Sequence, residues 1–213
     1  MTKETLTVHK ALAELKLLDA RIIKVIDEGV FCAANKHSNE KINGIPVEDF
    51  KVQIKGTYDR ASDLIRRHDA IKKAVSLSNA KTMIKIAGED YSVAEAIYMK
   101  NHGIEYKSYL LERMKQQLNE AQAEINLHNG SDLEKRADQY VTGIYGSKEG
   151  KTNSTDIEKV RNDFLKANSY ELVDPIRIKE KIDELEKEID NFMAEVDSAL
   201  SVSNALTEIT IEY

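Results

Sequence analysis

Apolar residues recur along four stretches of this chain at the spacing of a heptad helix. The first stretch begins at Val8 and ends before Gly29, where we expect a left-handed C-cap, and the others cover 48–78, 92–128 and 175–200. A helix with so narrow an apolar stripe is not stable alone, so each stripe has to pack against another helix or another subunit. The sequence therefore predicts a mainly α fold of long antiparallel coiled-coil helices.

The residues at the seams of these helices are the ones we expect in the core or at an oligomer interface. The second stretch has a less regular seam than the others, because polar residues such as His68 stand on it. We interpret His68 as a buried, hydrogen-bonded polar insert rather than a metal ligand, since the histidines are scattered singly. The seam residues that we single out are Leu15, Ile22, Ile104, Leu111, Leu118, Ile182, Leu185, Ile189 and Val196.

Turn-forming residues interrupt the heptads in two places. Residues 30–47 are expected to form a loop or a short hairpin, because Asn43-Gly44 is a preferred two-residue hairpin turn. Residues 129–170 are expected to be an insertion of short helices and a loop. Apart from these interruptions, we treat 1–213 as a single elongated helical domain.

One segment of the chain is repeated: 74–86 aligns without gaps with 199–211, and in both copies a heptad helix turns into an alternating strand. We expect Asn to break each helix in the left-handed conformation and the hydroxyls to bond loose backbone groups; a ligand site there is the weaker alternative. We therefore expect the strands after the second and the last long helices to lie side by side in a small β element. The residues of this helix-to-strand switch are Ser78, Asn79, Thr82, Ser203, Asn204 and Thr207.

A capping box of Ser92 and Glu95 marks the start of the third heptad stretch, and Asn129-Gly130 marks its end. Its apolar residues keep strict steps of seven, so we expect an uninterrupted helix. At 1.5 Å per residue this helix is about 50 Å long.

Composition argues against several classes of function. Charged residues make up 32% of the chain and aromatic residues 6%, which is typical of long solvated helices. The net charge of -6 argues against nucleic acid as the main ligand, because phosphate binding needs an excess of Lys and Arg. Cys32 is the sole cysteine, which excludes an intramolecular disulfide, and we expect it to be a small apolar packing residue.

The sequence predicts no catalytic, cofactor-binding or metal-binding residues, and hence no cofactor. The segment 143–152 ends in Gly-Lys-Thr, but its glycine spacing is not that of a phosphate-binding loop. One basic cluster is interleaved with acidic residues, so we interpret it as a salt-bridged helix face, with contact to an acidic partner as the alternative. The cluster consists of Arg60, Arg66, Arg67, Lys72 and Lys73.

Four segments together resemble the septicolysin-like family and uncharacterised proteins of prophages of Gram-positive bacteria. They are the helix at 11–22, the exit at 78–82, the stretch 88–97 and the closing helix from Val173 to Asn204. The resemblance covers about two thirds of the chain. It implies helical coiled-coil proteins that form rings or bundles without established catalytic residues, and the family name implies pore formation. Ala205 departs from relatives that carry tryptophan there.

These features favour a non-enzymatic structural protein that forms a coiled-coil homo-oligomer and, by the resemblance, belongs to a phage particle. The expected partners are copies of itself and other phage structural proteins; a membrane is not an expected partner. A membrane-active cytolysin and a regulatory adaptor that binds partner helices are the alternatives. Because the N-terminus lacks the apolar core of a signal peptide, we expect the protein to be cytoplasmic when made, and in the virion if phage-encoded.

Overall fold

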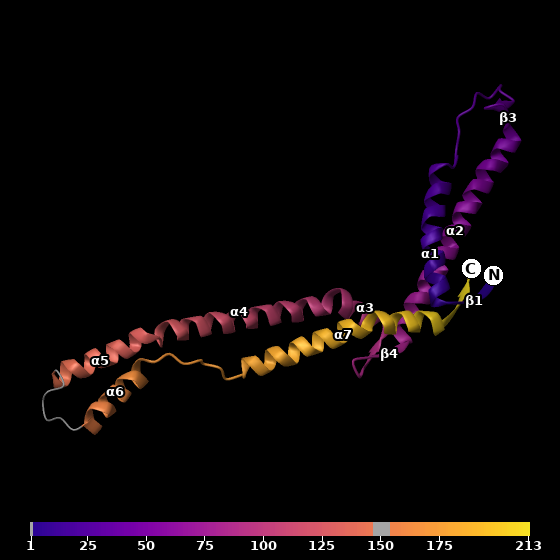
Figure 1. Cartoon of the computed structure of the whole chain (residues 1–213). Helices are drawn as coiled ribbons and strands as arrows, with labels where there is room; N and C mark the ends of the chain where they lie inside the picture. Colours follow the sequence, from indigo (N-terminus) through magenta and orange to yellow (C-terminus); the bar gives the residue numbers. More distant parts are fainter. Residues whose placement is uncertain (1, 147–153) are drawn as a thin grey trace. The chain divides into compact units, whose positions relative to one another are not determined.

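The structure is a computed structural model that describes residues 2–146 and 154–213 (Figure 1). The fold is mainly helical with small two-stranded antiparallel sheets, as the sequence predicted. We had treated the chain as one elongated domain; the structure groups it into two compact units. Unit 1 comprises 1–102 together with 191–213, and unit 2 comprises 103–190.

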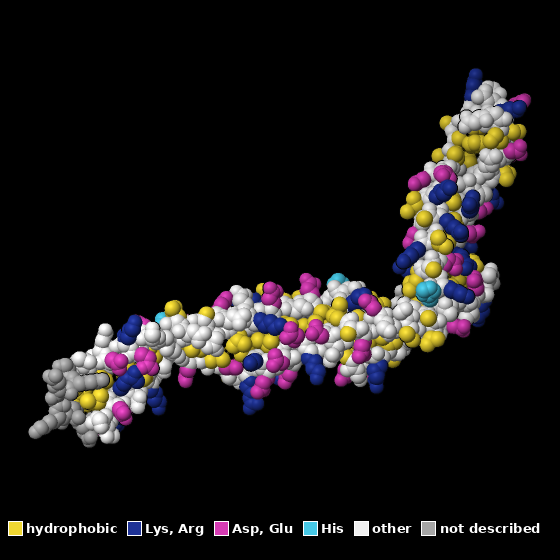
Figure 2. Space-filling model, in the orientation of Figure 1, with side chains coloured by type: hydrophobic (Ala, Val, Ile, Leu, Met, Phe, Trp, Pro, Cys, Tyr) yellow, Lys and Arg dark blue, Asp and Glu magenta, His cyan; other side chains and the backbone are white. Residues whose placement is uncertain are grey.

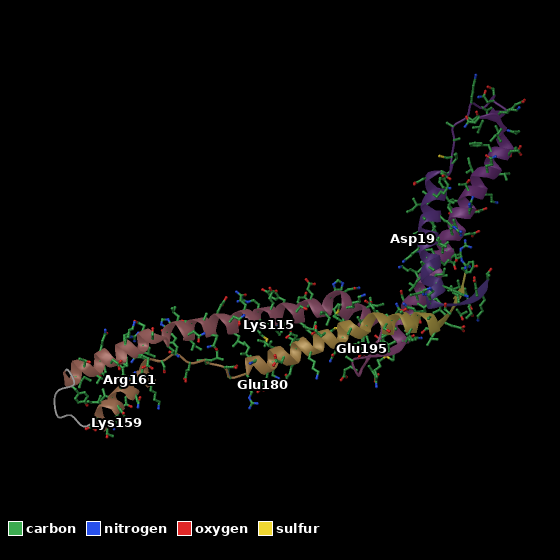
Figure 3. The ribbon with its side chains drawn as sticks, in the orientation of Figure 1. Asp19, Lys115, Lys159, Arg161, Glu180 and Glu195 are labelled. Carbon is green, nitrogen blue, oxygen red and sulfur yellow. The ribbon has the colours of Figure 1, made fainter. Side chains whose placement is uncertain are left out.

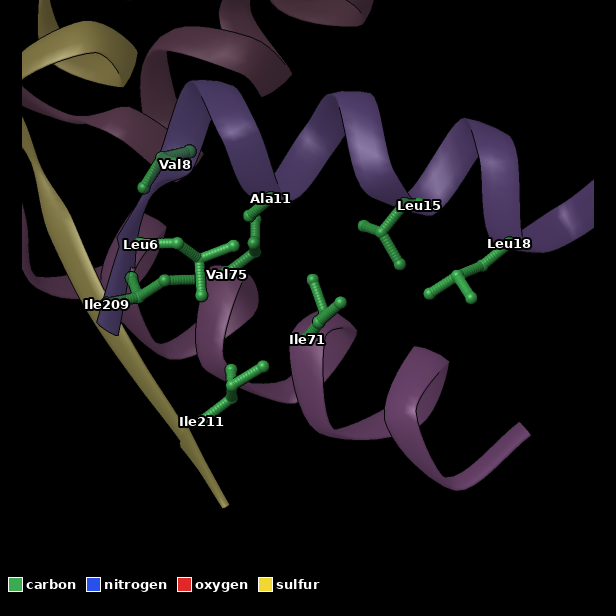
Figure 4. Packing of buried hydrophobic residues seen from close by; sticks show 9 residues of the cluster. All are labelled: Leu6, Val8, Ala11, Leu15, Leu18, Ile71, Val75, Ile209 and Ile211. Carbon is green, nitrogen blue, oxygen red and sulfur yellow. The ribbon is translucent and has the colours of Figure 1, made fainter. Parts of the chain in front are cut away.

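Unit 1 contains the first two heptad helices, α1 (Val8–Asp27) and α2 (Val47–Lys81), which pack side by side (Figure 1). They are antiparallel, because Glu14 contacts Arg67 near the start of α1 while Lys24 and Arg60 line a common hollow near its end. Their seams meet in one core beside two short strands, as Figure 4 shows. The buried core residues are Leu6, Val8, Ala11, Leu15, Leu18, Ile71, Val75, Ile209 and Ile211.

The two ends of α1 differ in how well the sequence predicted them. Thr7 caps the start, because its hydroxyl accepts a hydrogen bond from the Lys10 backbone N–H. At the other end the prediction of a left-handed C-cap at Gly29 is wrong, since the cap is Glu28, in right-handed conformation. Gly29 serves a different purpose: a Cβ there would lie 2.6 Å from the Val25 carbonyl oxygen, so only glycine fits.

The predicted hairpin after α1 is present. Strand β2 (Lys41–Ile42) pairs with β3 (Ile45–Pro46), and the turn between them has Asn43 at φ 52° and Gly44 at φ 82°. Positive φ at both central residues is typical of a type I′ turn, for which Asn-Gly is the preferred pair.

Unit 1 contains two further sheets, and their strands pair differently from the prediction. Strand β4 (Met83–Ile86) follows α2 and pairs with β5 (Glu89–Ser92), whereas β6 (Glu208–Glu212) pairs with the N-terminal strand β1 (Lys3–Thr7). The strands after the two exits therefore lie in different sheets. The physical reason is that a tight turn at Ala87 and Gly88 gives β4 a partner next in the chain.

The third heptad stretch is not one uninterrupted helix. The predicted capping box of Ser92 and Glu95 opens α3 (Val93–Tyr98), a π-helical turn follows at Met99–Gly103, and α4 (Ile104–His128) continues the run. A π turn is wider than an α turn, so it changes which face the later heptads present. Ile97 is accordingly 37% exposed and Ile104 only 9%, although they are one heptad apart.

Unit 2 contains α4, α5 (Ser131–Tyr145), α6 (Ser154–Asn168) and residues 178–190 of α7 (Ile178–Leu206), whose remainder belongs to unit 1. The short helices α5 and α6 lie within the predicted insertion. Arg161 of α6 (Figure 3) bonds Glu134 and Asp138 of α5, and the rings of Tyr140 and Phe164 are 4.8 Å apart. These contacts hold the two short helices together.

Candidate assembly surfaces

The two helix-to-strand switches have the same backbone geometry. The Thr82 N–H donates to the Ser78 carbonyl oxygen at 2.8 Å, and the Thr207 N–H donates to that of Ser203 at 2.9 Å. Ser78 and Thr82 also place their hydroxyls 3.4 Å apart. The serines and threonines lie at the helix ends, but these bonds join backbone groups, or two hydroxyls at Ser78 and Thr82, rather than the hydroxyls and backbone groups that were predicted to bond.

The predicted role of the two asparagines is wrong. Asn79 and Asn204 lie inside helices that continue to Lys81 and Leu206, and neither has a positive φ. Each helix instead ends because the chain turns extended at the threonine and enters a sheet, where strand pairing supplies the backbone hydrogen bonds.

The likeness of the two switches extends to the strands that pair with them. Met83 faces Ser92 in one sheet, and Glu208, its equivalent in the repeat, faces Thr7 in the other. Both partner residues are N-caps, and each is followed by a buried valine. We call the β4–β5 pair the hairpin joint and the β1–β6 pair the end joint.

Matching hydrogen bonds confirm that the joints are equivalent. The Val93 N–H donates to the Thr82 carbonyl oxygen at 2.9 Å in the hairpin joint, and the Val8 N–H donates to that of Thr207, also at 2.9 Å, in the end joint. The gap-free sequence repeat covers only the exit side of this duplication. The other side had a signal, because Thr7-Val8-x-x-Ala11 and Ser92-Val93-x-x-Ala96 share one pattern.

Arg67 ties the end joint to the helices of unit 1. Its guanidinium donates to Glu4 of β1 at 2.9 Å, to Glu14 of α1 at 3.0 Å and to the phenol oxygen of Tyr213, and it lies 4.7 Å from the centre of that ring. The hydrogen bonds that Arg67 donates to Glu14 and Glu4 raise its pKa above the ordinary value, and they outweigh the opposing effect of burial. Of the five clustered cations, Arg66 makes an ion pair of the predicted kind, with Asp63 on the same helix at 3.3 Å, whereas Arg67 pairs with acids outside α2.

An apolar hollow lies between β4 and the last turns of α7, all within unit 1. Met83, Val202 and Leu206 line it and are exposed, Leu206 by 76%. The equivalent positions beside the end joint hold Glu208, Leu77 and Lys81. At these three positions, only the surface beside the hairpin joint is therefore apolar.

The predicted seam residues are buried to different degrees. Leu15 and Val196 are buried in unit 1, where Ile22 packs half-buried against the core. Ile104 and Ile182 are buried in unit 2. The other seam residues of unit 2 are half-buried: Leu111, Leu118, Leu185 and Ile189.

A second apolar groove lies between α4 and the first turns of α7 in unit 2, and hydrophobic side chains run along both helices in Figure 2. Leu110, Met114, Ile176 and Leu185 form its apolar lining, which we call the unit 2 groove. Leu110 remains 54% exposed. Ion pairs join the two helices along the groove: Lys107 with Glu188, and Lys115 (Figure 3) with Glu186 at 2.6 Å.

The described residues contain no group of three or more metal-binding side chains. His68 is half-buried and contacts Asp19 and Asp69, so it is a partly solvated polar insert rather than a fully buried one. The expectation that Cys32 packs in the interior is wrong, because it is exposed in the segment between α1 and β2. Most of the 143–152 segment lies outside the described residues.

Within the part of the chain that the structure describes, no helix is both long and apolar enough to span a membrane. Comparisons with protein families, with curated proteins and with solved structures found no match to this chain. The resemblance to the septicolysin-like family therefore stays a prediction.

Proposed function

We propose that this protein is a non-enzymatic structural protein that assembles with copies of itself through its coiled-coil helices. The further proposal that it belongs to a phage particle, beside other phage structural proteins, rests on the sequence resemblance alone. Self-assembly has independent support from the side chains of unit 2.

The single observation that carries the proposal is the unit 2 groove. Two antiparallel helices there bury Ile104 and Ile182 and leave the other four seam residues half-buried, while Leu110 and Ile176 at the groove stay more than half exposed. In a stable coiled coil, each seam side chain inserts between residues of a facing helix and loses contact with water. Unit 2 thus exposes an apolar helix surface. A second copy would supply the surface that packs against it.

Burial of the exposed apolar side chains would also stabilise an assembly. Burying a leucine or isoleucine side chain stabilises by roughly 1.5–3 kcal/mol. Covering a few such residues would offset part of the entropy lost when two copies join. Two exposed tyrosines, Tyr106 one turn before Leu110 and Tyr109 directly before it, would enlarge the buried area.

The test replaces Leu110 with Glu and compares the variant with Gln117→Glu, which adds the same charge one heptad further along α4. Molar mass is measured by light scattering behind size-exclusion chromatography, and helix content by circular dichroism. We expect wild-type protein and Gln117→Glu to be oligomeric. Leu110→Glu should lower the molar mass while helix content is unchanged, because Leu110 is half-exposed within one copy.

Two results would contradict the proposal. A wild-type protein that stays monomeric at the highest soluble concentration would exclude self-assembly as its function. An oligomer that Leu110→Glu leaves intact would show that the unit 2 groove is not the contact.

A further inference from the structure

The ends of the chain meet in a sheet that no covalent turn closes. Thr2 and Tyr213 exchange both of their backbone hydrogen bonds, at 2.9 and 3.2 Å, and the N and C labels lie together in Figure 1. The hairpin joint, with the same register, is closed by Ala87 and Gly88. The end joint therefore has the register of the hairpin joint but is held together only by non-covalent contacts.

We propose that the end joint is exchanged between copies: β6 of one copy pairs with β1 of a second copy. The inference rests on the proposed self-assembly and names a second contact, beside the unit 2 groove, through which copies join. The occupant of β1 in the assembly is thus the C-terminal strand of another copy of this chain.

Exchange remakes with a second copy every contact that closes the end joint within one copy. These contacts comprise five register pairs, Lys3 to Thr7 with Glu208 to Glu212, and the apolar contacts of Leu6, Ile209 and Ile211 with the core of α1 and α2. The exchanged and the unexchanged form share these interactions. Their free energies therefore differ mainly by the entropic cost of association, which becomes smaller as the protein concentration rises. The hairpin joint has no such freedom, since a two-residue turn fixes its partner.

The helix residue that contacts the paired strands also differs between the two joints. The position equivalent to Arg67 is Phe192, whose ring packs on Tyr91 at 5.6 Å in the hairpin joint. A pair of aromatic rings suits a permanent contact. Arg67 instead bonds Glu4 and Tyr213, one from each chain end, and hydrogen bonds of this kind can re-form with strands from either copy.

A disulfide across the end joint reports which copies pair. Because Thr2 and Tyr213 form a hydrogen-bonded pair and the two classes alternate, Thr5 and Thr210 form a non-hydrogen-bonded pair, with Cα atoms about 4.5 Å apart. Their hydroxyl oxygens lie 3.2 Å apart. This spacing falls in the range that a disulfide bridges, about 4.4–6.8 Å between Cα atoms.

The experiment uses two full-length single-cysteine proteins in a Cys32→Ser background, Thr5→Cys and Thr210→Cys. The two are mixed, unfolded, refolded together at high concentration and oxidised, and covalent dimers are counted on a non-reducing gel. Since neither chain can close its own disulfide, a bond between positions 5 and 210 forms only between copies. Lys3→Cys with Glu212→Cys, another non-hydrogen-bonded pair of this sheet, repeats the measurement if either threonine variant fails to fold.

The hairpin joint supplies the matched control, because Lys85 and Asp90 are the equivalents of Thr210 and Thr5 and also face one another. A mixture of Lys85→Cys and Asp90→Cys measures the crosslinking that random collisions cause at the equivalent sheet position. We expect at least a fivefold higher yield of covalent dimer from the end-joint mixture than from the hairpin-joint mixture.

Equal yields from the two mixtures, with oligomers present by light scattering, would overturn strand exchange and leave the proposed self-assembly standing. A protein that is monomeric throughout would overturn both. A raised yield that disappears when Arg67 is also changed to Phe, its own equivalent in the hairpin joint, would assign the selectivity for exchange to Arg67.

Discussion

Two glycines of unit 1 occupy positions with different backbone conformations. Gly88 has a φ of 88° in the turn between β4 and β5, whereas Gly56 lies inside α2, and a Cβ would meet nothing within 4 Å at either position. Space therefore does not distinguish them, and only backbone conformation does.

We predict opposite effects of alanine at these two positions. Gly56→Ala should raise the free energy of unfolding by roughly 0.5–1 kcal/mol, because alanine favours the helix. Gly88→Ala should lower it by about 1 kcal/mol or more, because a side chain disfavours a positive φ. Urea denaturation of both variants beside the wild type measures the two shifts, and equal shifts would contradict the explanation.

At the scale of an element, the start of α3 depends on one reciprocal pair. The Ser92 hydroxyl accepts from the Glu95 N–H at 3.1 Å, and the Glu95 carboxylate accepts from the Ser92 N–H at 2.8 Å. Ser92 is buried, so water cannot take its place readily. The hydrogen bond from the Ser92 backbone N–H is the largest cause that lowers the pKa of Glu95 below its ordinary value, and the Ser92 side chain adds to it.

Ser92→Ala should therefore lower the free energy of unfolding by about 1 kcal/mol at neutral pH. A lowered pKa means that the Glu95 contribution is complete above the ordinary carboxyl pKa and is lost as pH falls below it. The difference between Glu95→Ala and wild type should accordingly shrink on acidification, because this variant removes the carboxylate that accepts from the Ser92 backbone N–H, a donor that Ser92→Ala keeps. Thermal melts of both proteins at pH 7 and pH 3 check this, and a difference that stays constant would contradict the role of Glu95.

At the scale of the whole molecule, the equivalence of the two joints predicts that the chain can be opened at the other one. A circular permutant joins Tyr213 to Thr2 through Asn-Gly and begins at Gly88, so that it ends at Ala87. It closes the end joint and opens the hairpin joint, whose pairing register is the same. We expect the permutant to fold with the helix content of the wild type.

Circular dichroism and thermal melting measure the outcome for the permutant. A control permutant opened between Ala70 and Ile71, within the core of α2, should not fold, because its new ends would lie in buried packing. If both permutants fold equally well, or neither does, then the joints are not the independent connections that their geometry indicates.

Local patterns decided what could be predicted from the sequence. Heptad spacing identified the long helices and their seams, and Asn43-Gly44 and the Ser92 capping box identified a turn and a helix start, because each signal acts within a few residues. The π turn at Met99–Gly103 was missed, since a wider turn leaves the heptad spacing of the sequence unchanged. Strand pairing was predicted wrongly because backbone hydrogen bonding carries no side-chain signature of its partner.

The sequence by itself determined that this protein is a set of long helices with narrow apolar stripes and two like exits into strands. Those properties follow from periodicity and from local propensity, which each segment carries alone. Only the tertiary structure decided that β6 pairs with the first strand of the chain and that Arg67 holds both ends. Such contacts join residues far apart in sequence, and they depend on which partners the packed helices bring within reach.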